Sequence, residues 1–445
     1  MRVVIIGAGL VGTSIAANLA ADNDVIVVED DPDRADQLQF DLDILSILGD
    51  GTSLATLQEA EVDDADMFIA CTGDDRTNLV ACGTAKTLGD PFTIARVKSA
   101  EYLRTWQRKH GAFGADHLVC SDLLTAENIV RVTGLPAAID LDPFADGLVH
   151  MAEFEITADS PVASQTVAEA DRFKSLTFAG LFRDGSVLIP GGETRIEAGD
   201  RAVVIGSPAS VRGFSNDLNP STTPDKADDI VIAGGSEIGY HTARLLEERE
   251  SKSRLIERDE TRARELAEEL SGTVVMHQDA TDVDFLSREH VDEADIVIAT
   301  MPSDERNLLV AVLAKRLGVD RVIAVVNNDE YVTLFEEIGI DVAVNPRGVT
   351  AEEITRFSFE SVAENLSVLE NDQAEVLELE LDSDSSMVGY TIRELDSELS
   401  GQFVVGALTR GGTLITPRGD TTLEAGDHVI IFVETSFADE IIARA

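Results

Sequence analysis

The first residues whose types and spacing could do chemistry are three glycines near the start of the chain. Gly7, Gly9 and Gly12 follow the apolar run 3–6, which predicts a buried strand, and they open a stretch that predicts a helix. In this setting Gly7 allows a tight turn and Gly9 lets the backbone approach a pyrophosphate, while Gly12 lets helix and strand pack closely. Amides at the helix start would then hold the phosphates. We predict a nucleotide site here; the alternative is a glycine turn without a ligand.

An acidic residue, Glu29, stands at the end of the next predicted strand. A carboxylate in this place accepts hydrogen bonds from ribose hydroxyls and repels a 2′-phosphate, which disfavours NADP. NAD, ADP and ATP present the same ribose to Glu29, so this residue does not choose among them.

Polar residues also follow the later predicted strands, at the sheet edge where doubly wound folds bind ligands. The capping of a helix is the alternative role for these residues, and it is the favoured one for Asp75. Arg96, near the end of the apolar run 92–97, can reach a phosphate, and a surface ion pair is its alternative. The predicted first site comprises Gly7, Ala8, Gly9, Leu10, Val11, Gly12, Glu29, Asp50, Thr72, Asn78 and Arg96.

The chain is an internal repeat of two halves. The apolar run 230–233 leads to a second group of glycines, and further landmarks recur in the same order at nearly the same offset. The predicted second site comprises Gly234, Ser236, Ile238, Gly239, Glu257 and Asp279.

The second site differs from the first at three positions that would touch a ligand. A serine side chain crowds the closest approach to a pyrophosphate, and the other two changes remove a hydroxyl and a cation. We therefore expect the first half to hold the principal dinucleotide site and the second to bind more weakly or to bind another ligand. The changes are Ser236 for Gly9, Met301 for Thr72 and Val325 for Arg96.

Each half has two parts. In the first part, short Val/Ile-rich runs alternate with helical patterns, which predicts a parallel sheet covered on both faces. One predicted helix runs from Glu260 to Leu270, and Gly272 is its predicted stop signal. Another predicted helix begins at a capping box formed by Thr350 and Glu353. The second part has short strands and glycine turns, which predict a small α+β domain rich in hairpins. The expected domains are 1–135, 147–217, 228–350 and 374–445, with a polar linker at 219–225.

The composition narrows the classes of function. The 445 residues include 83 acidic and 35 basic ones, giving a formal net charge of −48, which opposes contact with nucleic acid or anionic lipid. The acids are spread along the whole chain and resemble the surfaces of proteins from very salty cytoplasm, where the Debye length is ~3 Å at 1 M salt. No run is long enough for a membrane helix. Cys71, Cys82 and Cys120 have no paired spacing, which suits a reducing cytosol.

No set of residues predicts catalysis or a metal site. The hairpin part 160–204 has neither histidine nor cysteine, and no nucleophile elbow, P-loop lysine or metal-ligand spacing occurs in the chain. We therefore expect a binding protein without enzymatic activity. The alternative is a soluble NAD-dependent oxidoreductase, whose turnover of NAD(H) would distinguish it.

The order of these motifs resembles the TrkA family of RCK-domain proteins. The glycine motif, Glu29, the run Gly49-Asp50-Gly51-Thr52 and Arg96 resemble the family's nucleotide domain, and 197–200 and 424–427 resemble its C-terminal domain. The resemblance implies two Rossmann-like lobes with doubly wound parallel sheets, each followed by an RCK C-terminal domain. It also implies NAD(H) and ATP or ADP as ligands, and assembly into a gating ring. The expected protein is a cytoplasmic regulatory subunit, held at the inner face of the membrane by a TrkH-like potassium-translocating partner.

Overall fold

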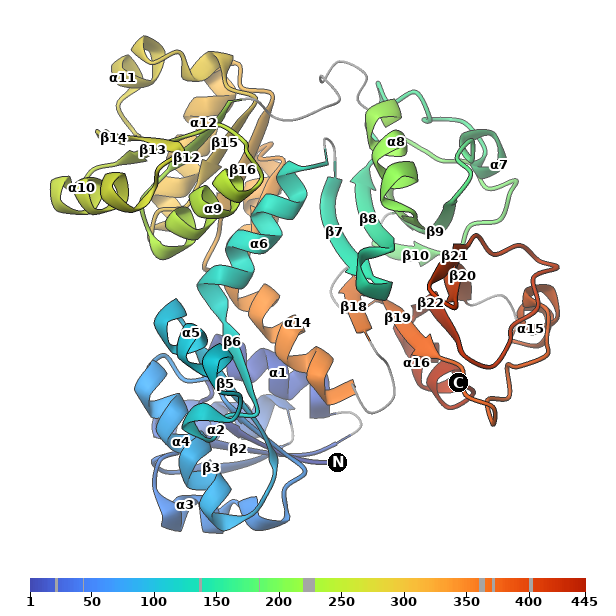
Figure 1. The fold of residues 1–445 in the computed structure, drawn as a ribbon, viewed down its shortest axis with the longest axis horizontal. Coiled ribbons are helices and arrows are strands. Elements are labelled where there is room, and N and C mark those ends of the chain that lie inside the picture. The colour runs from blue at the N-terminus through green and yellow to red at the C-terminus, as the bar shows by residue number, and fades with distance from the viewer. Residues whose placement is uncertain are drawn as a thin grey trace. The chain divides into compact units, whose positions relative to one another are not determined.

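The computed structural model describes residues 1–20, 23–42, 44–135, 138–183, 185–218, 229–359, 365–369, 373–399 and 403–445. The chain divides into two compact units, Met1–Val130 with Ala227–Ser358, and Arg131–Lys226 with Phe359–Ala445. Each unit therefore takes one part from each half of the repeat (Figure 1). The predicted linker 219–225 lies outside the described residues.

The first unit contains two parallel six-stranded sheets with helices on both faces, as the alternation of apolar runs and helical patterns predicts. Strand β12 (Ile230–Ala233) is apolar throughout and buried, and β1 (Arg2–Ile6) is apolar and buried after Arg2, because helices cover both faces of each strand. The first sheet has the order β3-β2-β1-β4-β5-β6 and the second has the equivalent order β14-β13-β12-β15-β16-β17. Both orders reverse direction beside the first strand of the lobe, and a crevice for ligands forms at such a point.

The elements of the first lobe are β1 (Arg2–Ile6), α1 (Leu10–Ala20), β2 (Asp24–Glu29), α2 (Pro32–Leu42), β3 (Leu45–Leu48), α3 (Leu54–Glu59), β4 (Met67–Ala70), α4 (Asp75–Leu88), β5 (Phe92–Val97), α5 (Ala100–Arg108) and β6 (His117–Cys120). Those of the second lobe are β12 (Ile230–Ala233), α9 (Glu237–Glu248), β13 (Ser253–Glu257), α10 (Glu260–Glu269), β14 (Thr273–His277), α11 (Val283–Arg288), β15 (Ile296–Ala299), α12 (Asp304–Leu317), β16 (Arg321–Val325), α13 (Val332–Glu337) and β17 (Val342–Val344).

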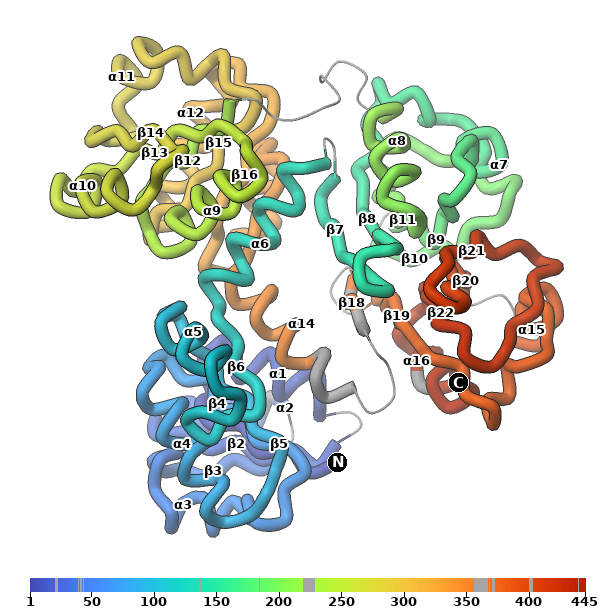
Figure 2. Tube along the Cα trace, in the orientation of Figure 1, coloured from blue at the N-terminus to red at the C-terminus, as the bar shows by residue number. Residues whose placement is uncertain are grey.

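One further helix follows each sheet, α6 (Ser121–Thr133) and α14 (Pro346–Phe359). Ala351 and Ile354 of α14 lie in the apolar core of the first lobe, packed with residues of β1 and α1. In the other direction, Arg249 at the end of α9 donates a hydrogen bond from Nη1 to the Val130 carbonyl of α6, at 3.0 Å. The two lobes of this unit are thus interlocked by helices that each half supplies to the other (Figure 2).

One predicted helix start is wrong, and another predicted helix is confirmed to within one residue. Helix α14 begins at Pro346, and Asn345 Oδ1 accepts hydrogen bonds from the amides of Arg347 and Gly348. Thr350 lies inside the helix and donates its hydroxyl to the Pro346 carbonyl, so it starts no capping box. In α14 a proline suited to the first helical turn, with an asparagine before it, was the stronger start signal. Helix α10 spans Glu260–Glu269 with Leu270 as its C-cap, which agrees with the predicted helix to within one residue.

The second unit contains two antiparallel five-stranded sheets, one from each half. Their facing surfaces share one apolar core, in which the rings of Phe182 and Phe432 pack edge to face with centroids 6.4 Å apart. A Cβ atom at Gly180 would lie 2.3 Å from the Phe432 ring, so the sheets meet closely only because this residue is glycine. The hairpin-rich character predicted for these parts is therefore present.

The first of these sheets contains β7 (Ala138–Phe144), β8 (Val149–Glu155), β9 (Leu176–Arg183), β10 (Ser186–Leu188) and β11 (Arg201–Gly206), with α7 (Val167–Ala170) and α8 (Pro208–Leu218). The second contains β18 (Asn365–Leu369), β19 (Ala374–Glu380), β20 (Phe403–Arg410), β21 (Thr413–Ile415) and β22 (Asp427–Glu434), with α15 (Ile392–Glu398) and α16 (Thr435–Ile442). Short 3-10 turns occur at Val62–Asp64, Ala112–Gly114, Ala145–Gly147, Val291–Glu293 and Asp329–Tyr331.

Among the described residues, none of the helices has the length and apolar character needed to cross a membrane.

Candidate nucleotide-binding site

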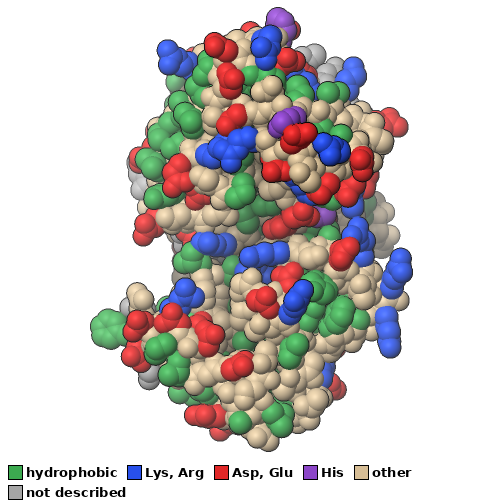
Figure 3. Space-filling view, turned by 90° about the vertical axis from the view of Figure 1, so that its left-hand side faces the viewer, with side chains coloured by type: hydrophobic (Ala, Val, Ile, Leu, Met, Phe, Trp, Pro, Cys, Tyr) green, Lys and Arg blue, Asp and Glu red, His purple; other side chains and the backbone are tan. Residues whose placement is uncertain are grey.

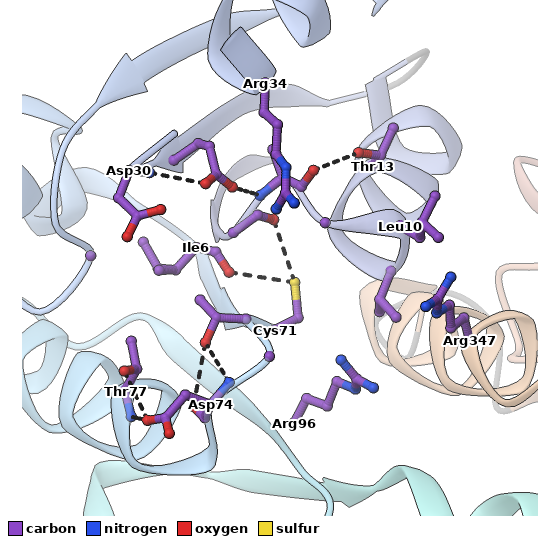
Figure 4. Close-up of a pocket in the computed structure, with 18 of the residues that line it drawn as sticks. Ile6, Leu10, Thr13, Asp30, Arg34, Cys71, Asp74, Thr77, Arg96 and Arg347 are labelled. Atoms are coloured by element: carbon purple, nitrogen blue, oxygen red, sulfur yellow. Dashed lines mark hydrogen bonds between the residues drawn. The ribbon is translucent and has the colours of Figure 1, made fainter. Parts of the chain in front are cut away.

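A cavity of about 990 Å³ opens at the carboxyl ends of the strands of the first sheet. The turn after β1, the end of β2 and the segments after β3 and β4 line it, so it lies where the topology predicts a ligand crevice (Figure 4). Its volume is at the upper end of the range of about 300–1,000 Å³ that is usual for small-molecule sites. Of the predicted first-site residues it brings together Gly7, Ala8, Gly9, Leu10, Val11, Glu29, Asp50, Thr72 and Arg96.

The three glycines of the first glycine loop (residues 7–12) have different reasons to be glycine. Gly7 has φ +100°, a backbone conformation that side chains disfavour. A Cβ atom at Gly12 would lie 1.9 Å from the Gly7 carbonyl oxygen, so Gly12 permits close packing of α1 on β1. A Cβ atom at Gly9 would meet no atom within 4 Å. The fold therefore requires Gly7 and Gly12, whereas at Gly9 the absent side chain leaves room above the start of α1.

The start of α1 presents amide groups to this space. Helix α1 begins at Leu10, and the first N–H groups of a helix have no partners within the helix. Together with the helix dipole they favour an anion, which suits the phosphates of a nucleotide.

Glu29 has a structural role that the sequence did not reveal. Its side chain is only 5% exposed, and it accepts hydrogen bonds from the amides of Ala8, Asp30 and Asp31. The carboxylate thereby joins the end of β2 to the glycine loop. An ionised carboxylate has about four lone-pair positions, so one remains for a ribose hydroxyl.

Two predicted site residues do not face the cavity. Asn78 is 1% exposed, and its side chain bonds the amide and hydroxyl of Thr72 and the carbonyl of Arg96. It holds the ends of β4 and β5 together, so its assignment as a ligand residue is corrected to this buried role. Gly12 lies behind the loop and acts through packing.

The acids near these strand ends are engaged locally. Asp50 Oδ1 accepts hydrogen bonds from the hydroxyl and amide of Thr52, and these bonds lower the pKa of its carboxyl. The N-cap of α4 is Asp74, whose Oδ1 accepts from the Thr77 amide. Asp75 instead accepts from the amides of Lys98 and Ser99, in the turn before α5. The capping role predicted for Asp75 is therefore wrong, because Asp74 caps α4 and Ser99 caps α5.

Four basic side chains line the cavity: Arg34, Arg96, Lys98 and Arg347. Arg96 donates from Nε to the hydroxyl of Ser121 at 2.8 Å, and no carboxylate of the described chain lies within ion-pair distance of it. The surface ion pair considered for Arg96 is thus absent from the described part. The sequence analysis missed Arg34, Lys98 and Arg347. The residue equivalent to Arg34 in the second half is Arg262, so the recurrence of arginine at this position could have identified Arg34 as a candidate site residue.

The second glycine loop (residues 234–239) is closed by its own side chains. Ser236 is the N-cap of α9: its hydroxyl accepts from the Gly239 amide and donates to the Thr300 carbonyl at 2.6 Å. Arg262 reaches over the loop, donating to the Gly235 carbonyl and to Glu237, both at 2.9 Å. The Ser236 hydroxyl, the Gly239 amide and the Arg262 guanidinium therefore already have partners within the chain.

The cavity beside this loop is correspondingly small, about 300 Å³. Gly234, Glu257 and Met301 line it, but Ser236, Gly239 and Asp279 do not, and Ile238 lines the first cavity instead. Asp279 accepts a hydrogen bond from Arg306 at 2.7 Å. Although burial acts to raise it, hydrogen bonds from Thr281 and the charge of Arg306 lower the pKa of Asp279. Val325, opposite Arg96, is 1% exposed and offers no cation.

Comparisons with known proteins agree with this architecture. The chain matches the TrkA-N domain at residues 3–121 and 230–346, and the TrkA-C domain at residues 151–219 and 376–444. It is 34% identical to a Trk system potassium uptake protein TrkA homolog of Archaeoglobus fulgidus, covering 99% of each chain. It is 33% identical to the Trk system potassium uptake protein TrkA of Vibrio alginolyticus, covering 97% of this chain and 96% of the relative.

A solved structure shares the fold over the whole chain. The GsuK channel bound to NAD superposes with a TM-score of 0.63 at 22% identity, covering 100% of this chain and 79% of that one. With matching domains in both halves and relatives of the same length, the chain belongs to the TrkA family of Trk system potassium uptake proteins.

Proposed function

We propose that this chain is a nucleotide-sensing regulatory subunit that gates a potassium-transporting membrane protein of the Trk type. It binds NAD(H), and ADP or ATP, in the first cavity, and it works in the cytoplasm at the inner face of the membrane. The observation that carries the proposal is the first glycine loop, where open space at Gly9, the start of α1, Glu29 and Arg96 converge on one cavity. Each of these groups suits one part of a nucleotide: the phosphates or the ribose.

Gating follows from unequal affinity for two arrangements of the protein. A ligand shifts such an equilibrium only by the difference between its affinities for the two states, typically by about 1–3 kcal/mol of coupling. In this proposal the chain assembles with copies of itself into a ring attached to the transporter. Membership of a family of potassium uptake proteins and the likeness to a channel bound to NAD support this reading.

Two measurements test the proposal. Thermal unfolding of the purified chain is followed with NAD+, NADH, ADP and ATP, because a ligand that binds only the folded state raises the melting temperature as its concentration increases. Potassium uptake is then compared in cells with and without the gene. The proposal expects stabilisation by at least one nucleotide and impaired uptake without the gene. Unchanged uptake, or steady turnover of NADH by the purified chain, would refute it.

A further inference from the structure

The first cavity is lined by residues of both halves of the chain. Ile238, Asn327, Pro346 and Arg347 come from the second half, and they lie opposite the first glycine loop. All of them belong to the same compact unit, in which α14 is packed into the core of the first lobe. The second half therefore forms part of the wall of the first site.

Arg347 is the second-half residue whose chemistry matters most here. It lies at the start of α14, and its guanidinium points from beside Leu10 into the same space as that of Arg96 (Figure 4). Burial lowers the pKa of Arg96, and the charge of Arg347 acts in the same direction, against the charges of Cys71, Asp122 and Asp75, which act to raise it. Two like charges are thus held near each other, a costly arrangement unless an anion lies between them.

The surrounding charge makes these arginines more unusual. The protein has 83 acidic residues for 35 basic ones, and many of its arginines form ion pairs. In the described part of the chain no carboxylate lies within ion-pair distance of Arg96 or Arg347. Figure 3 shows basic and acidic side chains mixed over one face of the molecule, with several basic ones across its middle. An anionic ligand between the two guanidinium groups would offset their repulsion.

The repeat gives an internal comparison. Thr125 donates its hydroxyl to the Ser121 carbonyl, and Thr350 donates its hydroxyl to the Pro346 carbonyl. These matching bonds align α6 with α14 as equivalent helices of the repeat. In this alignment the counterpart of Arg347 is Asp122. Burial raises the pKa of Asp122 to about 6, and the charge of Glu237, in the first turn of α9, adds to the shift. Asp122 lines the first cavity, and at the start of α9 it brings a carboxylate near that of Glu237.

We infer that Arg347 is a phosphate-binding residue of the first site, supplied by the second half, so that a bound nucleotide fastens α14 to the first glycine loop. A guanidinium binds phosphate through charge-assisted and often paired hydrogen bonds, which explains the choice of arginine. The carboxylate of Asp122 at the equivalent position gives the second loop no such help. This inference rests on the nucleotide site proposed above and names the residue through which that site reaches the other half.

The test uses the full chain with Arg347→Gln and, as a matched control, Arg264→Gln, which removes an exposed cation of α10 paired with Glu260. Calorimetry measures the affinity for ADP, which carries phosphates, and for adenosine, which carries none. Loss of a charge-assisted contact predicts about a tenfold or greater weakening of ADP binding by Arg347→Gln. Adenosine binding stays unchanged in both variants, and Arg264→Gln binds ADP like the original chain.

Hydrogen exchange gives a second readout that a merely structural arginine would not change. ADP slows exchange of the amides at 347–352 in the original chain, and this protection is lost in Arg347→Gln. If Arg347→Gln does not fold, Arg347→Lys keeps the charge without the planar fork and is expected to weaken ADP binding by a smaller factor. ADP affinity in Arg347→Gln equal to that in the control overturns this inference alone. Absence of binding of both ADP and NAD+ by the original chain overturns the proposed site as well.

Discussion

At the scale of single residues, Gly9 and Ser236 occupy equivalent positions in the two glycine loops. They differ in whether a side chain caps the start of the helix that follows. The space at Gly9 is open, whereas the Ser236 hydroxyl bonds the Gly239 amide and the Thr300 carbonyl. A helix start that is capped by its own side chain has one fewer amide for a ligand. The asymmetry predicted from the sequence thus has a physical basis in the first turn of each helix.

Asp122 leads to a prediction about pH. Its carboxyl has a pKa of about 6 in the folded chain, raised by burial from an ordinary value of 3.8. The folded state therefore holds the proton more tightly than the unfolded state does, and ionisation of Asp122 as pH rises through 6 destabilises the fold. Asp122→Asn removes this penalty. The variant should melt roughly 2–6 °C above the original chain at pH 7.5, and the difference should shrink towards zero near pH 4.

Thermal unfolding of both proteins from pH 4 to pH 8 checks this prediction. The comparison is between two chains at the same pH, so titration of the other groups largely cancels. A difference in melting temperature that does not vary with pH would contradict the assigned role of the Asp122 charge.

At the scale of elements, the same ion pair secures the turn before the last long strand in both antiparallel sheets. Arg410 of β20 donates two hydrogen bonds to Asp427, at 2.7 and 2.8 Å, and Arg183 of β9 does the same to Asp200. Asp427 is fully buried. Burial acts to raise its pKa, but hydrogen bonds from Arg410 and the Glu424 amide lower it. The repeated segments 197–200 and 424–427 thus owe their acidic ends to this ion pair.

Asp427→Asn should destabilise the second unit by about 3 kcal/mol, because it leaves a guanidinium without its buried partner. Glu424→Gln is the control: Glu424 pairs with the same arginine at the surface, and its loss should cost less than about 1 kcal/mol. Because the folded pKa of Asp427 is lowered, its contribution is present above the ordinary value of 3.8 and is lost as pH falls below it. Urea unfolding at pH 7 measures both variants, and equal effects would contradict the assignment.

The sequence predicted the elements that local patterns determine and missed those that distant contacts determine. The apolar runs, the glycine turns and the repeat predicted two parallel sheets with a cavity at their carboxyl ends. The packing of Ile354 into the first lobe could not be predicted, because its partners lie more than 200 residues away in the chain. The same is true of Asn78, whose type suits a ligand but whose neighbours bury it, and of Arg347, which reaches the cavity only because the halves interlock.

At the scale of the whole molecule, the interlocking decides how the two sites can be studied. Separating the halves near residue 220 would remove Ala351 and Ile354 from the core of the first lobe and expose its apolar surface. Comparison of the sites therefore requires the full chain, with substitutions that disable one site at a time. The two glycine loops offer such a pair, because Gly9 and Ser236 are equivalent positions in cavities of about 990 and 300 Å³.

Calorimetric titration of the full chain with ADP and with NAD+ distinguishes one principal nucleotide site from two, using the original protein, Gly9→Asp and Ser236→Asp. We expect one principal site per chain. Gly9→Asp should abolish binding without unfolding the protein, because a new carboxylate would occupy the phosphate position in a space that holds no protein atom within 4 Å. Ser236→Asp should bind like the original chain. Two sites of equal affinity, or unchanged binding by a folded Gly9→Asp protein, would contradict the account.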